Sequence, residues 1–132
     1  MREIMKVLSV LVDGKPMDFR LTKLDAFSGA ALLRLLLRLE EKLQRFSILD
    51  LVSSLSEEEL RSVMETCLNH TEVLLPAGPN PVMAGKEWGY PELKHDAVTC
   101  MTLTVESISW SLSGFFGEGG PGEAPARPAT AP

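Results

Sequence analysis

The sequence predicts an α+β fold that is mainly α: an N-terminal β-hairpin packed on a bundle of three to four helices, with a long C-terminal helix. Three observations predict it. Residues 4–12 and 17–24 are apolar runs separated by Asp13-Gly14, a tight-turn pair. Residues 28–43 are rich in leucine. The later segments repeat apolar residues at helical spacing.

The second strand of the hairpin alternates apolar and polar residues, and Pro16 is acceptable only near a strand start or at a sheet edge. A lone two-stranded hairpin is marginally stable in water. We therefore expect this hairpin to pack on the helices or to pair with another chain.

The leucine-rich segment predicts a helix from about Ser28 to Leu43, with Ser28 as its N-cap. Only Arg34 and Arg38, four residues apart, mark an outward stripe. The remaining face is so apolar that other elements or other chains must cover it.

Two further helices follow. Ser47 is expected to cap a short helix through residues 48–52. Ser56 and Glu59 have the spacing of a capping box, which predicts a helix from there to about Asn69-His70.

Residues 71–75 are compatible with a short strand, and the Pro- and Gly-rich residues 76–81 predict a rigid irregular loop. Trp88 and Tyr90 lie at the exit of this region, and the last helix is expected from about Pro91 to Phe116. Its predicted apolar stripe comprises Leu93, Ala97, Cys100, Met101, Thr104, Val105, Ile108, Leu112 and Phe115.

The organisation predicted from these elements is a single globular domain over residues 1–116. Residues 117–132 (GEGGPGEAPARPATAP) lack residues that could pack, so they are expected to form a disordered Gly/Pro/Ala-rich tail.

The net charge of −5 is unevenly distributed: residues 1–45 carry +3 and residues 46–132 carry −8. This polarity favours self-association or a charged protein partner over nucleic acid, which requires a strongly basic face. Two halves that complement each other within one fold are an equally good explanation.

The expected compartment is the cytoplasm. Residues 1–5 contain no apolar leader, the two cysteines lie within apolar helical patterns, and no stretch reaches the roughly 18 uninterrupted apolar residues of a membrane span. No membrane partner is expected.

Catalytic patterns are sparse. With two histidines, no nucleophile elbow and no Gly-rich phosphate loop at a helix start, the sequence predicts neither an enzyme nor a bound cofactor. Cys67, His70, His95 and Cys100 offer four soft metal ligands, but their spacing matches no structural zinc pattern well.

Three features are candidate protein-binding sites. The first is the basic row of Arg34 and Arg38, continued by Lys42 and Arg45, for which a solvated helix face is the alternative explanation. The others are aromatic segments, each of which could instead fill the core. Their residues are Trp88, Tyr90, Trp110, Phe115 and Phe116.

The order of these signals resembles that of a tail assembly chaperone of long-tailed phages or prophages. The similarity covers about residues 17–117 and rests on FRLTKL leading into AFSGAALLRLLLRL, on SLSEEEL, on NPVMAGKEWGYPEL and on the helix ending in Gly-Phe-Phe.

The resemblance implies a mostly helical protein that binds the tape-measure protein in the infected cell, keeps it soluble, helps to recruit tail-tube subunits and is not part of the mature virion. It also implies that a longer form made by translational frameshifting can exist. A homo-oligomer is a further expectation, from the charge polarity and the unpaired hairpin edge.

Two alternatives remain open. One is a bacterial helical adaptor or regulatory protein with a partner unrelated to phage. The other is a small metal- or thiol-dependent regulator that uses Cys67, His70, His95 and Cys100.

Overall fold

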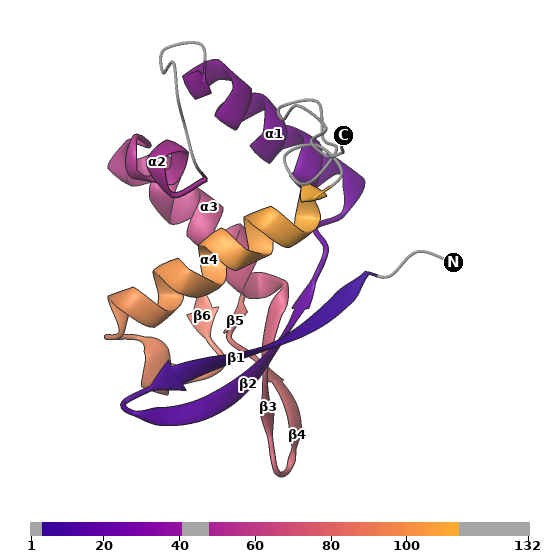
Figure 1. Cartoon of the computed structure of the whole chain (residues 1–132), viewed down its shortest axis with the longest axis vertical. Coiled ribbons are helices and arrows are strands. Elements are labelled where there is room, and N and C mark those ends of the chain that lie inside the picture. Colours follow the sequence, from indigo (N-terminus) through magenta and orange to yellow (C-terminus); the bar gives the residue numbers. More distant parts are fainter. Residues whose placement is uncertain (1–3, 41–47, 114–132) are drawn as a thin grey trace, which may run out of the picture.

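The structure is a computed structural model that describes residues 4–40 and 48–113 (Figure 1). Its elements follow in the order β1 (Met5–Val12), β2 (Lys15–Thr22), α1 (Ala26–Glu40), α2 (Ile48–Ser53), α3 (Glu57–Asn69), β3 (Thr71–Leu75), β4 (Gly78–Pro81), β5 (Met83–Ala84), β6 (Glu87–Trp88), the 3-10 helix η1 (Pro91–Leu93) and α4 (Ala97–Ser111).

The N-terminal hairpin is confirmed. β1 and β2 pair antiparallel without interruption, from Met5 opposite Thr22 to Val12 opposite Lys15. Asp13 (φ 54°) and Gly14 (φ 78°) both adopt the positive φ that a type I′ turn requires.

The prediction of a helical bundle is wrong, because the fold combines β-sheets with helices. β1, β2, β3 and β4 form a four-stranded antiparallel sheet in that order, and β5 and β6 form a second, two-stranded one. The expected short strand is β3, which pairs with β2. The predicted irregular loop over residues 76–81 instead contains β4. Two prolines are tolerated there because β4 is an edge strand, where a missing N–H breaks no ladder.

Helix α1 starts earlier than predicted. The Ser28 N–H donates to Oδ1 of Asp25 at 2.8 Å, so Asp25 caps the helix and Ser28 lies inside it. The predicted end at Leu43 and the predicted cap Ser47 lie outside the described residues.

The capping box of α3 is confirmed. The Ser56 N–H donates to Glu59 Oε1 at 3.0 Å, and the Glu59 N–H donates to Ser56 Oγ at 3.1 Å.

The prediction of a single long C-terminal helix is wrong. η1 occupies Pro91–Leu93, and α4 starts afresh at Ala97 behind Asp96, which accepts from the Thr99 N–H at 3.0 Å. An Asp at this position satisfies the free N–H groups of a new helix start, which favours two helices over one.

Two buried clusters divide the core. The sheet cluster comprises Val12, Phe19, Leu21, Leu68, Val73, Val82, Met83, Tyr90, Leu93, Cys100 and Leu103. The helix cluster comprises Leu24, Leu32, Leu36, Leu51, Val52, Leu55, Val63, Cys67, Ile108 and Leu112. α3 and α4 contribute to both, and α4 runs between the sheet and the helices α1 and α2 (Figure 1).

Candidate protein-binding surface

An open apolar groove lies between α2 and α4. We call it the α2–α4 groove. Its volume is about 470 Å³, and its lining residues are Leu49, Ala97, Val98, Met101, Thr102, Val105 and Glu106.

The groove exists because α4 presents two faces. Its buried face is formed by Thr99, Cys100, Leu103, Thr104, Ser107 and Ile108. The groove residues on α4 follow one another at i, i+1, i+4, i+5, i+8 and i+9, so they form a second stripe along the same helix. At 1.5 Å per residue this stripe is about 14 Å long, which matches two to three turns of a partner helix.

The predicted stripe of α4 is therefore divided. Cys100 and Ile108 are buried as expected, whereas Ala97, Met101 and Val105 line the groove.

Two apolar side chains of the groove are strongly exposed: Val98 has an exposed fraction of 78% and Leu49 of 53%. Each exposed apolar Å² removed from water contributes roughly 25 cal/mol. A partner with an apolar face would gain free energy by covering both residues.

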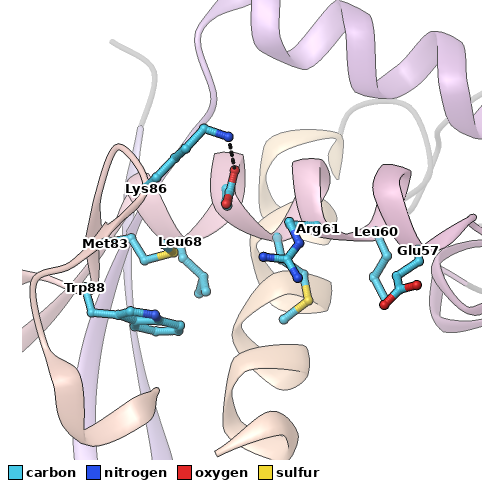
Figure 2. Close-up of a pocket in the computed structure, with 9 residues that line it drawn as sticks. Glu57, Leu60, Arg61, Leu68, Met83, Lys86 and Trp88 are labelled. Atoms are coloured by element: carbon cyan, nitrogen blue, oxygen red, sulfur yellow. Dashed lines mark ion pairs between the residues drawn. The ribbon is translucent and has the colours of Figure 1, made fainter. Parts of the chain in front are cut away.

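A second groove, the α3–β5 groove, has a different character (Figure 2). Its volume is about 300 Å³, and its lining combines five apolar residues with four charged ones. The apolar residues are Leu60, Met64, Leu68, Met83 and Trp88, and the charged ones are Glu57, Arg61, Glu65 and Lys86. Lys86 Nζ lies 3.9 Å from Glu65 Oε1, so this ion pair links the β5–β6 turn to α3.

The structure places the sequence-predicted site residues on several elements. Trp88 lines the α3–β5 groove. Tyr90 is buried in the sheet cluster, and its hydroxyl donates to Glu92 Oε1 at 3.2 Å. Burial, followed by the charge of Glu92, raises the pKa of Tyr90.

Trp110 is half-buried and contacts the N-terminal hairpin. Its Nε1 donates to the Ile4 carbonyl at 3.4 Å, and the Lys23 ammonium lies 4.6 Å from its ring centre. Phe115 and Phe116 lie outside the described residues.

The basic row lies on α1. Arg34 is exposed, and Arg38 forms an ion pair with Glu59 on α3 at 3.3 Å. Arg38 therefore links the two helices. Lys42 and Arg45 lie outside the described residues.

Sequence reasoning missed Leu49, Val98 and Thr102 as surface residues. A signal was available: Val98 and Thr102 lie four residues apart, beside the stripe that was assigned to the core.

The four candidate soft ligands are dispersed. Cys67 belongs to the helix cluster and Cys100 to the sheet cluster. Burial raises the pKa of the Cys67 thiol to about 12 and, with the charge of Asp96, that of Cys100 to about 11. Over residues 4–40 and 48–113 no group of three His, Cys, Asp or Glu is arranged to hold a metal ion.

Comparisons of the chain with protein-family models, with curated proteins and with solved structures found no match. Among the helices that the structure describes, none is long and apolar enough to cross a membrane.

Proposed function

We propose that this chain is a phage tail assembly chaperone that holds an apolar helical segment of the tape-measure protein in the α2–α4 groove. The observation that carries the proposal is the exposed apolar stripe of α4 beside Leu49. A contiguous apolar surface on a small domain is typical of a binding site. The order of sequence signals described above supplies the identity of the partner.

The chemistry of the groove supports this partner class. Among the residues that the structure describes, Glu106 is the only acidic one that lines the groove, and the other lining side chains are apolar except Thr102. Such a groove favours an amphipathic helix that inserts apolar residues at i, i+3 and i+4. Covering such a helix would keep a long, apolar partner from aggregating, and bound partner would then be available to tail-tube subunits.

The experiment is co-expression with a tape-measure protein from the genome that encodes this chain. The wild-type chain should keep that protein soluble and co-purify with it. Val98→Glu places a charge where the partner would bury an apolar face, and should weaken binding tenfold or more. Since Val98 is 78% exposed, this variant should fold normally.

Ser62→Glu is the matched control, because it introduces the same charge at an exposed position of α3. It should bind as wild type does. If the tape-measure protein remains insoluble beside the wild-type chain, the chaperone assignment is wrong. If it is soluble and Val98→Glu binds normally, the groove assignment is wrong.

The adaptor alternative uses the same groove for a protein unrelated to phage. It would be favoured if the chain failed to bind the tape-measure protein, while Val98→Glu still abolished binding to a partner captured from the host and then identified.

A further inference from the structure

The two edges of the four-stranded sheet differ in how they are protected. β4 is four residues long and contains Pro79 and Pro81, which cannot donate to an added strand. β1 is eight residues long, has no proline, and pairs with β2 without a bulge. Lys6 is its only charged residue, and this side chain lies 5.8 Å from the ring centre of Trp110. β1 therefore lacks the short length, the prolines and the bulges that protect many edge strands.

The hydrogen bonds between β1 and β2 show which residues of β1 direct their backbone N–H and C=O groups toward the open edge. The Lys23 N–H donates to the Ile4 carbonyl at 2.8 Å, so Ile4 and every second residue after it direct their backbone groups toward β2. The residues between them direct their N–H and C=O groups away from β2. These residues are Met5, Val7, Ser9 and Leu11.

Within the described part of the chain, no hydrogen bond to these outward backbone groups is present. The side chains of these four residues are exposed, and three of them are apolar: Met5 is 48%, Val7 57% and Leu11 68% exposed. The open edge is thus flanked by an apolar row.

We propose that β1 pairs antiparallel with β1 of a second copy of this chain, about a twofold axis at Leu8. In this register Met5 lies opposite Leu11 of the second copy, and Val7 lies opposite Ser9 of the second copy. All four outward residues of each strand then form hydrogen-bonded pairs. Four pairs, each exchanging two bonds, give about eight hydrogen bonds.

The alternative twofold registers are poorer. An axis at Val7 or at Ser9 leaves one outward residue of each strand without an opposite partner. An axis at Lys6 places the two Lys6 ammonium groups opposite each other, which is unfavourable. The axis at Leu8 instead places Lys6 opposite Val10 of the second copy. The sequence of β1 is therefore self-complementary in one register, and this favours a second copy over an unrelated strand as the occupant.

The register can be tested by disulfide trapping in the full chain. Leu8→Cys places two thiols in directly opposed positions at the axis, about 4.5 Å apart between Cα atoms, within the range of a disulfide. Lys6→Cys is the control, because its two Cα atoms would lie about four residues, or roughly 13 Å, apart. Mild oxidation should cross-link Leu8→Cys into a dimer and leave Lys6→Cys monomeric on denaturing gels. Equal cross-linking of the two would overturn the register.

Light scattering and sedimentation of the full chain test whether the open edge of β1 forms the dimer interface. Wild type should be a dimer that persists at about 0.5 M salt, since backbone bonds and apolar contacts are weakly screened. Val7→Pro removes an outward N–H without affecting a bond to β2, so it should give a folded monomer. Val7→Ala shortens the same side chain but keeps the N–H, so it should remain dimeric.

Four results would contradict the proposal. A wild-type monomer at all concentrations excludes it, and a monomer that dimerises when residues 114–132 are removed assigns the edge to that segment. A dimer that dissociates with salt assigns association to the opposite charges of the two halves. A folded Val7→Pro dimer places the interface elsewhere. If Val7→Pro does not fold, the cross-linking of Leu8→Cys and Lys6→Cys decides whether the two β1 strands pair.

Discussion

The side-chain amide of Asn69 binds both backbone groups of Gly85. The Gly85 N–H donates to Oδ1 at 2.6 Å, and Nδ2 donates to the Gly85 carbonyl at 2.9 Å. Asn69 ends α3, and Gly85 lies in the β5–β6 turn with a φ of 67°. This contact therefore holds the β5–β6 hairpin against α3 and fixes one wall of the α3–β5 groove.

Asn69→Ala should lower the free energy of unfolding by about 1–3 kcal/mol, because it leaves both Gly85 groups without their partner. Asn69→Asp keeps the acceptor for the Gly85 N–H and loses the donor, so it should fall between wild type and the alanine variant. Urea denaturation measures all three. An alanine variant as stable as wild type would show that water replaces the amide at no cost.

Gly89 should not tolerate a side chain. A Cβ at this position would lie 2.3 Å from the Pro81 carbonyl oxygen, which is backbone and cannot rotate away. Gly89→Ala should therefore lower the free energy of unfolding by more than about 2 kcal/mol.

Gly14→Ala is the matched control. Gly14 has a φ of 78° but no atom within 4 Å of the added Cβ, so only backbone strain of about 1 kcal/mol is expected. Thermal unfolding of the two variants should thus separate a steric clash from a dihedral preference. Equal losses would mean that β4 moves away from Gly89 readily.

Local signals in the sequence predicted the parts of the fold that depend on neighbouring residues. The Asp13-Gly14 turn and the Ser56–Glu59 capping box each involve residues within four positions, and both were correctly located. The pairing of β2 with β3 was not predicted, since it joins Arg20 to Glu72 across 52 positions. The periodicity of one segment contains no information about such a partner.

The site was harder to predict, because polar side chains occupy part of the core face of α4. Thr104 is fully buried, and its hydroxyl donates to the Cys100 carbonyl at 2.8 Å. This local bond satisfies the hydroxyl and lets a threonine replace an apolar residue in the core. Met101 and Val105, which the predicted stripe assigned to the core together with Thr104, line the α2–α4 groove. Hydrophobic spacing alone does not separate these two faces of the helix.

The Ser56 cap gives a third prediction. Ser56→Ala removes the acceptor of the Glu59 N–H and should lower the free energy of unfolding by about 1 kcal/mol. Ser54→Ala is the control, because the Ser54 hydroxyl donates to the Asp50 carbonyl, at 3.0 Å, within the turn that follows α2 and not at the start of a helix. Denaturation of the two variants should differ, and equal midpoints would show that α3 is held by packing alone.

The last prediction concerns alkaline pH. Burial raises the pKa of Cys67 from 9.0 to about 12 in the native chain, while the Ser107 hydroxyl acts in the opposite direction. The unfolded chain releases this proton near pH 9, whereas the native chain retains it. The contribution to stability is therefore complete below pH 9 and falls as the pH rises toward 12, by roughly 1.4 kcal/mol per pH unit for one proton.

Cys67→Ala should flatten the decline of the urea midpoint between about pH 9 and pH 10.5 without removing it, because Cys100 and Tyr90 also have raised pKa values. Replacing both cysteines should flatten it further. A thiol reagent at pH 8 should react slowly with native protein and rapidly in urea, since the buried thiol remains protonated. If Cys67→Ala declines with pH as steeply as wild type, the thiol is ionised or solvated in the native chain, and the helix cluster around it is open.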